Sequence, residues 1–282
     1  MATETTTIRP ARTQGALQRS RVRHSGRFLL SHGALLARVT RNDLAARYVG
    51  SLLGIGWTVV TPALFLGVYS SLYLFVYKAP VAGLTRGQFV VYLTSGIVPY
   101  LMTAEAIGSG VSAVVANRSI LTNVVFPIDL LPPKAVLMAQ PTMAVGMAMV
   151  LVGALATGLA SWYLLLIPVI WFFQVLALLG VTWILSLINI VLRDLTQLIG
   201  IVLILLLIAS PIAYTTDKVP ASLKWIILIN PLAYYILGYH AVINGQIPSA
   251  LTCFGIVGFS VGIFGLGGWF FARMKAALVD YV

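Results

Sequence analysis

An unbroken run of 26 residues, Leu52 to Tyr77, contains no charged side chain. An α-helix needs about 20 apolar residues to cross a hydrocarbon core of about 30 Å, so this run is predicted to be a transmembrane helix. Arg38, Arg41 and Arg47 stand just before it. Each arginine would cost about 2.5 to 3.5 kcal/mol at the centre of a bilayer, so we expect them to hold the preceding segment in the cytoplasm.

The composition assigns the rest of the chain to the membrane as well. Of the 282 residues, 60% are hydrophobic and 9% are charged, and the mean hydropathy is +0.98. A soluble domain of this composition could not cover its surface with polar side chains. The single cysteine, Cys253, excludes an intrachain disulfide and a cysteine-based metal cluster. We expect it to be a small buried apolar residue.

The positive charge is concentrated at the N-terminus. The net charge is +11, and nine of the 18 Lys and Arg residues lie within the first 50. Such an arm could bind nucleic acid, but its place before a span favours a topology signal and contact with anionic membrane lipids. No nucleic-acid partner is predicted. Residues 1–27 are polar and lack the apolar core of a signal peptide, so they are predicted to be a disordered basic arm.

Residues 28–48 are predicted to form an amphipathic helix that lies on the cytoplasmic membrane surface. At 100° per residue, one apolar face is formed by Phe28, Leu35, Val39 and Ala46. An interface helix fits this face better than the alternative, an ordinary extension of the first span.

Six apolar stretches are predicted to be spans, so the expected fold is an all-α integral membrane protein. Their limits are about 52–77, 89–116, 135–160, 162–192, 195–214 and 251–272. If they alternate from a cytoplasmic N-terminus, 14 Lys and Arg residues lie inside and four outside, namely Lys78, Arg86, Lys218 and Lys224. This bias is typical of six helices with both termini cytoplasmic. Residues 28–282 are then one transmembrane domain.

Residues 215–250 are predicted to lie outside and to fold back on themselves. They contain an apolar run from 223 to 237 that Asn230 and Pro231 interrupt, which leaves two halves too short to cross. We expect two short re-entrant helices in the outer leaflet that form a lid or funnel. The alternative is a surface loop with an apolar patch.

The chain lacks the motifs that would let it use ATP or catalyse a reaction. None of its five lysines follows a glycine, so the phosphate-binding loop GxxxxGK[ST] is absent. The three histidines and seven acids are scattered, without a closely spaced carboxylate pair or an HExxH motif. We therefore predict no enzyme activity, no metal site and no cofactor bound by this chain.

Three charged residues are candidates for a specific role. Glu105 is the one acid placed clearly within a span, which makes it a candidate for the substrate path. The alternative is a neutral acid that is hydrogen-bonded near Ser109 or Ser112. Asp43 and Arg47 have the favourable acid-first i,i+4 order, so we expect them to pair with each other on the exposed side of the interface helix.

An aromatic stripe marks one side of the first span. Phe65, Tyr69, Tyr73 and Tyr77 recur every four residues and drift by only about 40° per step around the helix. Hydroxyl groups inside a bilayer need partners that lipid does not offer, so the stripe is predicted to face a conduit. The alternative is an interfacial aromatic belt with ordinary packing, which suits Tyr77 best.

Several short motifs occur along the chain in a specific order. The first is RNDLAARYVGSLLG at residues 41–54, followed by Trp57 and Pro62. The others are Gly96 to Pro99, Phe126-Pro127, Arg193-Asp194-Leu195, Ser210-Pro211-Ile212 and Asn230-Pro231-Leu232. Together they cover most of residues 28–275 and resemble the permease subunits of ABC type-2 exporters, specifically the group that exports O-antigen, teichoic acid, capsule and galactan chains.

The resemblance implies that two copies of a separate ATPase, which bind ATP and Mg, drive this chain from the cytoplasmic side. The coupling contacts would lie on the interface helix and on the connection 117–134. The candidate coupling residues are Arg41, Asp43, Arg47, Arg118, Phe126 and Pro127. Asp129 departs from the family's pattern, in which an arginine often follows Phe-Pro.

The expected protein is a homodimeric permease of the bacterial inner membrane that moves a lipid-linked polysaccharide outward. Six helices are few for a pore that passes a sugar chain, so a conduit on a two-fold axis is the economical solution. Gly258 and Gly262 could support close helix packing in the last span. The alternatives are an exporter of drugs or lipids within the same family, a membrane scaffold that transports nothing, and a membrane-bound glycan enzyme.

Overall fold

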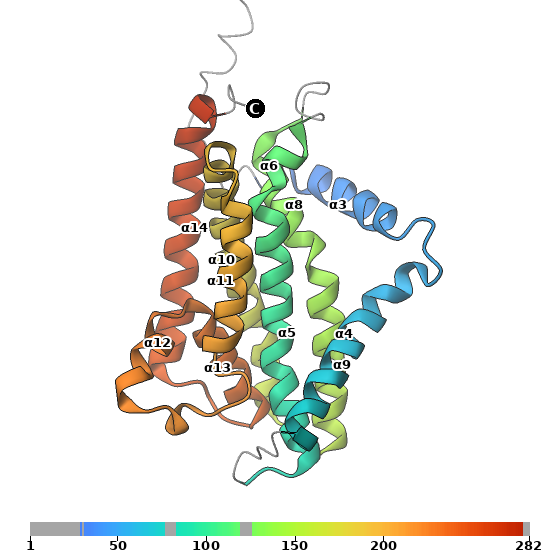
Figure 1. Cartoon of the computed structure of the whole chain (residues 1–282), viewed down its shortest axis with the longest axis vertical. Helices are drawn as coiled ribbons and strands as arrows, with labels where there is room; N and C mark the ends of the chain where they lie inside the picture. Colours follow the sequence, from blue (N-terminus) through green and yellow to red (C-terminus); the bar gives the residue numbers. More distant parts are fainter. Residues whose placement is uncertain (1–28, 30, 77–82, 119–125, 279–282) are drawn as a thin grey trace, which may run out of the picture.

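The computed structural model describes residues 29, 31–76, 83–118 and 126–278, and the regular structure in these residues is entirely helical (Figure 1). The predicted all-α fold is therefore confirmed. The arm 1–27, Phe28, Tyr77 and Lys78 lie outside the described residues. The interface helix predicted over 28–48 is α3, Gly33–Arg47.

Five described segments are long and apolar enough to cross a membrane. They correspond to the first four and the last of the predicted spans. They are Trp57–Val76 with α4 (Trp57–Ser71), α5 (Arg86–Val111), Ile128–Ala156 with α8 (Leu131–Met138) and α9 (Gln140–Ala156), Trp162–Val191 with α10 (Ile167–Val191), and Ala250–Lys275 in α14 (Ala250–Leu278).

Two of these segments differ from the predicted limits for local reasons. The first begins at Trp57, because residues 51–56 form a bend and a 3-10 turn. The second begins at Arg86, where Thr85 and Gln88 form a capping box that satisfies two free N–H groups. It ends at Val111 and is followed by the short α6 (Ala113–Ala116).

The fifth predicted span, 195–214, is shorter than expected. It is α11, Leu195–Ala209, and its 15 residues cover about 22 Å. This length is less than the roughly 30 Å of a hydrocarbon core. The helix stops because Pro211 disfavours the α conformation at the preceding residue, and Ser210 is extended.

The predicted break at Asn230 and Pro231 is confirmed. It separates α12 (Lys224–Ile229) from α13 (Pro231–Ile243), and the two helical segments are bent by 97°. The Oδ1 atom of Asn230 accepts a hydrogen bond from the N–H of Leu232 at 3.0 Å, and its Nδ2 donates to Ser210 Oγ at 2.8 Å. One side chain thus caps α13 and ties it to the end of α11.

The charges separate toward the two ends of the helix bundle. One end holds α3, α6 and the last turns of α14, and we call it the α3 end; the other holds the start of α5 together with α12, and we call it the α12 end (Figure 1). The described lysines and arginines at the α3 end are Arg38, Arg41, Arg47, Arg118, Lys134, Arg193, Arg273 and Lys275. Those at the α12 end are Arg86, Lys218 and Lys224.

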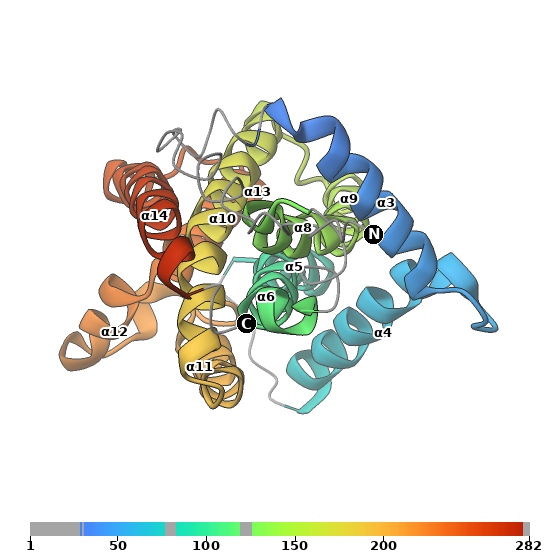
Figure 2. The same cartoon turned by 90° about the horizontal axis from the view of Figure 1, so that it is seen from above.

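Helix α5 lies at the centre of the bundle, surrounded by the other helices (Figure 2). A buried polar network holds it to α10 and α13. The Nε2 atom of Gln174 on α10 donates to the carbonyl oxygen of Pro99 at 3.1 Å and to Thr103 Oγ1 at 2.9 Å, and Tyr239 donates to its Oε1 at 3.0 Å. Lipid offers no hydrogen bonds, so these groups must satisfy one another.

Two glycine contacts set the distances between helices. A Cβ atom at Gly96 would lie 2.8 Å from Nε2 of His240, so the absence of a side chain on α5 makes room for α13. The His240 ring also stacks on Tyr92, with centroids 3.8 Å apart. Gly180 on α10 and Gly267 on α14 meet backbone to backbone, which lets these two helices pack along their length.

One sequence prediction about α14 is wrong, because Cys253 is exposed rather than buried. Gly258 and Gly262 make no close contact within the subunit, since a Cβ at either would meet nothing described within 4 Å. The side of α14 that faces the bundle carries Gly267, Ser260 and Ile256 instead.

We predict that Gly180→Ala destabilises the protein and that Gly258→Ala does not. The added methyl at Gly180 collides with the backbone of Ile263, and overpacking of this kind typically costs about 1–3 kcal/mol. The measurement is the temperature at which detergent-solubilised protein loses its monodisperse peak in size-exclusion chromatography. Equal transition temperatures for the two variants would contradict the helix packing described above.

Candidate functional site

Helix α3 is attached to the bundle along a side that carries both apolar and polar residues. Leu36 and Thr40 are its buried residues, and the helix packs against α8. The predicted apolar face is turned elsewhere, because Leu35 and Ala46 are exposed and Val39 is half-buried. Part of the predicted apolar face is thus left uncovered by the subunit.

The predicted pair of Asp43 with Arg47 does not form. Asp43 pairs with Lys134 on α8 instead. Their Nζ and Oδ2 atoms lie 2.7 Å apart, and a second, longer contact of 3.4 Å joins Lys134 Nζ to Asn117 Oδ1. The Lys134 side chain is only 11% exposed. A lysine so deeply placed needs an anionic partner, and α3 supplies it.

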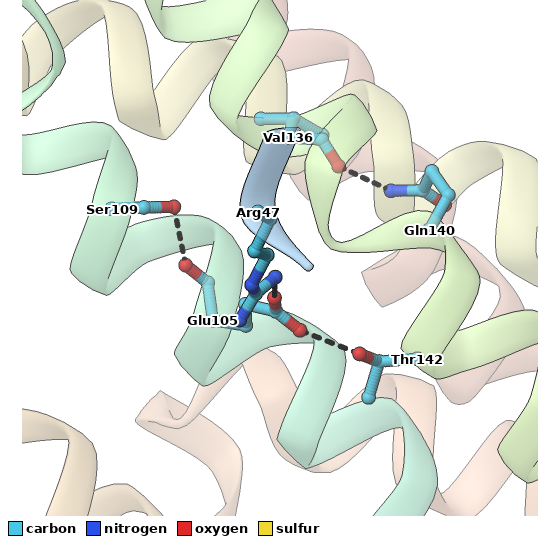
Figure 3. A network of polar contacts seen from close by, with 6 residues as sticks. All are labelled: Arg47, Glu105, Ser109, Val136, Gln140 and Thr142. Atoms are coloured by element: carbon cyan, nitrogen blue, oxygen red, sulfur yellow. Dashed lines mark hydrogen bonds and ion pairs between the residues drawn. The ribbon is translucent and has the colours of Figure 1, made fainter. Parts of the chain in front are cut away.

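Arg47 pairs instead with Glu105 of α5. Figure 3 shows the guanidinium in contact with one carboxylate oxygen at 2.5 Å, while Thr142 Oγ1 on α9 donates to the other at 2.6 Å. The hydrogen bond that Arg47 donates to the Glu105 carboxylate raises the pKa of Arg47 above its ordinary value. Glu105 therefore joins three helices. Ser109 donates to its backbone carbonyl oxygen rather than to its carboxylate.

A kink between α8 and α9 places Thr142 beside Glu105. Pro141 cannot donate an N–H within the helix, which interrupts the hydrogen-bond ladder there. The side chain of Gln140 makes two hydrogen bonds at this interruption: its Nε2 donates to the carbonyl of Val136 at 2.7 Å (Figure 3), and its Oε1 accepts from Trp171 Nε1 at 2.8 Å. The interruption between α8 and α9 therefore lies next to the ion pair of Arg47 and Glu105.

A third ion pair fixes the segment before α8. Lys275 on α14 contacts both carboxylate oxygens of Asp129, at 2.7 and 2.9 Å, and Trp183 Nε1 donates to the Asp129 backbone carbonyl at 3.1 Å. Phe126 packs beside this segment against Leu131 and its neighbours. The aspartate that departs from the family pattern therefore holds the connection onto α10 and α14.

The remaining candidate coupling residues lie at the same end but outside these ion pairs. Arg41 is exposed on α3, Arg118 is exposed just after α6, and Pro127 is half-buried beside Phe126. The three ion pairs use residues separated by 58, 91 and 146 positions in sequence. They therefore connect α3, the connection before α8, α5 and α14 into one unit at the α3 end.

Sequence reasoning missed four members of this unit: Thr142, Lys134, Asp129 and Lys275. Lys134 carried a usable signal, because a lysine that opens an apolar run requires a nearby acid. The topology placed Asp43 and Asp129 at the same end, so both were possible partners. Only the rotation of each helix selects between them, and this rotation is not readable from spacing alone.

The aromatic stripe lies along the edge of α4. The rings of Phe65 and Tyr69 stack with centroids 6.1 Å apart, and those of Tyr69 and Tyr73 are 5.1 Å apart. Tyr69 and Tyr73 pack partly on the main core, whereas Phe65 is 39% exposed. The buried side of the helix, with Leu66 and Ser70, adjoins the stripe. The stripe is thus a continuous ladder of rings at the border between core and surface.

The residues of the candidate site suit contacts between segments rather than chemistry. The described part of the chain contains no group of three or more His, Cys, Asp or Glu residues that could hold a metal ion. The carboxylates of Asp43, Glu105 and Asp129 are each engaged with a cation. What this arrangement can do is transmit a displacement of α3 or of the connection to the transmembrane helices.

Comparisons with known proteins identify the family of the chain. The family model described as ABC-2 type transporter matches residues 34–244. The chain is similar to O-antigen export system permease proteins, with 28% identity to one from Myxococcus xanthus over 83% of this chain and 90% of that protein. Two from Klebsiella pneumoniae are each 30% identical, over 81% and 82% of this chain and 89% of each relative.

We predict that Asp43→Ala lowers stability more than Arg38→Ala on the same helix. Removal of Asp43 leaves the nearly buried ammonium of Lys134 without its anionic partner, and an unsatisfied group of this kind costs about 1–3 kcal/mol. Arg38 is exposed and serves as the control. The loss is measured as a shift in the thermal transition of the purified protein.

The double variant Asp43→Leu with Lys134→Met should recover much of the lost stability, because apolar replacement of both partners leaves no uncompensated charge. A double variant as unstable as Asp43→Ala would show that the ion pair is not the cause of the loss.

Proposed function

Because this chain belongs to the ABC-2 type transporter family, we propose that it is the membrane subunit of an ATP-driven exporter of a lipid-linked polysaccharide, of the O-antigen, galactan or teichoic-acid type. In this proposal two copies of the chain join two copies of an ATPase subunit in the bacterial inner membrane. The ATPase binds ATP and Mg, and the polymer moves from the cytoplasm outward.

The set of three ion pairs at the α3 end is the observation that carries the proposal. A membrane subunit without a phosphate-binding loop must receive work from a partner through elements that move as rigid units. Two segments could receive this work, α3 and the connection before α8. The pairs Asp43 with Lys134, Arg47 with Glu105, and Asp129 with Lys275 hold these segments to the bundle. Motion of α3 then reaches α5 and α9 directly.

The charge distribution supports the direction of transport. Basic residues are concentrated at the α3 end, and the positive-inside rule assigns such an end to the cytoplasm. The ATPase would dock there. The α12 end, with its bent helix pair, would then face the outside and carry the exit.

The aromatic ladder on α4 supports a sugar polymer as the substrate. Aromatic faces stack on the apolar faces of sugar rings, and the hydroxyls of Tyr69 and Tyr73 add hydrogen-bonding capacity. Phe65, Tyr69 and Tyr73 form such a ladder at an edge of the subunit. A conduit between two copies along this edge would give the polymer a row of rings to pass.

Reversal of the Arg47 and Glu105 charges tests the coupling step. Arg47→Glu and Glu105→Arg alone should each lower polymer exported per ATP hydrolysed by roughly fivefold to tenfold, which corresponds to about 1–1.4 kcal/mol. The double reversal should restore part of this ratio. Arg38→Glu, the same charge change at an exposed position of α3, should leave it unchanged.

The measurement uses the permease and its ATPase in proteoliposomes, with export and phosphate release followed together. Parallel loss of both activities without rescue would point to failed assembly rather than coupling. A permease that purifies alone and exports without any ATPase would refute the proposed function as a whole.

The conduit is tested by Tyr69→Ala and Tyr73→Ala in one protein. We expect polymer export to fall by roughly tenfold or more, since loss of the stacking of a tyrosine ring on the sugar at two sites removes about 1 kcal/mol or more at each. Phe75→Ala is the matched control, because Phe75 is 70% exposed on the same segment and outside the ladder. Equal export by the two variants would remove the conduit from α4.

A further inference from the structure

An apolar cavity lies at the α12 end between the last turn of α11 and the bent helix pair. Its volume is about 490 Å³, within the range of about 300–1,000 Å³ of small-ligand sites. Most of its lining is aliphatic. The lining residues are Leu205, Ile208, Ala209, Tyr214, Lys218, Val219, Pro220, Leu223, Ile226 and Ile227.

The cavity exists because α11 is short. The helix ends at Ala209 after 15 residues, so it falls about 8 Å short of a hydrocarbon core of about 30 Å. The chain then turns at Ser210 and Pro211, and α12 returns beside the end of α11. Leu205 and Ile208 remain exposed at 58% and 69%. Apolar surface at the end of α11 is therefore left exposed.

The cavity has one cation at its polar side. Lys218 is exposed and lines the cavity, whereas its neighbour Asp217 does not. Tyr214 also lines it, but its hydroxyl already donates to the carbonyl of Ala209 at 2.9 Å. The lysine ammonium is thus the group that can donate hydrogen bonds to a bound anion.

Exposed tryptophans place this region at a membrane interface. Trp225, next to Lys224 on α12, is 56% exposed, and Trp162, at the same end of the bundle, is 87% exposed. Tryptophan and lysine side chains gather at the headgroup level of a bilayer. If the α12 end lies in the outer leaflet as proposed above, the cavity opens to its acyl chains and Lys218 lies near its phosphates.

We propose that this cavity binds an anionic membrane phospholipid, with one acyl chain among the aliphatic residues of α11 and α12 and the phosphate on Lys218. The bound lipid would fill the volume that the short helix leaves and hold α12 against α11. This lipid is a resident component, not the transported molecule, and its site rests on the proposed placement of the α12 end in the outer leaflet.

The test uses full-length permease in nanodiscs that contain phosphatidylglycerol with a photoactivatable diazirine on one acyl chain. The same diazirine chain on phosphatidylcholine is the neutral comparison, and labelled peptides are located by mass spectrometry. We expect the phosphatidylglycerol probe to label residues 205–227. Lys218→Gln should lower this labelling by about fivefold to tenfold, as expected for loss of one charge-assisted hydrogen bond.

Two further variants sharpen the result. Lys224→Gln removes an exposed lysine of α12 that does not line the cavity, so labelling should not change. Ala209→Phe fills the cavity and should lower labelling by both probes. Because Lys218→Gln alters an exposed side chain, the proposal stays testable even where Ala209→Phe fails to fold.

Two outcomes would overturn the proposal. Equal labelling by both probes that does not respond to Lys218→Gln would show ordinary surrounding lipid only. Displacement of the phosphatidylglycerol probe by an equal amount of polyprenyl phosphate would assign the cavity to the anchor of the transported polymer. Labelling needs neither ATPase nor polymer, so its failure is distinct from failure of the transport proposal.

Discussion

A hydrocarbon environment offers no hydrogen bonds, and this constraint explains where the polar residues of the chain stand. Inside the bundle, Gln174 satisfies groups from α5 and α13 at once, and Gln140 donates to the carbonyl of Val136 next to Pro141. Asn230 accepts from a free N–H at the start of α13. At these three places an amide side chain supplies hydrogen bonds that lipid could not.

The same constraint drives the ionised groups to the ends of the bundle, where they form long-range connections. Asp43, Glu105 and Asp129 each meet a cation from a distant segment at the α3 end. One partner of each pair is nearly or largely buried and the other is more exposed. Removal of one partner alone is therefore costly, whereas replacement of both by apolar residues costs little. Each pair also fixes the relative position of two elements that are distant in sequence.

Much of the fold could be predicted from the sequence, because apolar length and turn residues are local signals. The run without charges contains α4, and Asn230 with Pro231 separates α12 from α13 at the expected residue. Which residues face each other could not be predicted. Asp43 paired with Lys134 rather than Arg47, since this choice depends on how α3 is rotated against α8. The spacing of residues along one helix does not reveal how that helix is rotated against its neighbour.

The 97° bend between α12 and α13 has a consequence for how the chain is built into the membrane. Neither half can be inserted as a span, and the partners of α13 come from α5, α10 and α14, the last of which is synthesised after it. The notch at Gly96 receives His240 only when α13 arrives. The core around α13 is therefore completed in two stages: α13 can pack against α5 and α10 once it is made, whereas its contacts with α14, such as the hydrogen bond between Tyr235 and Ser260, form only after the last helix has been synthesised.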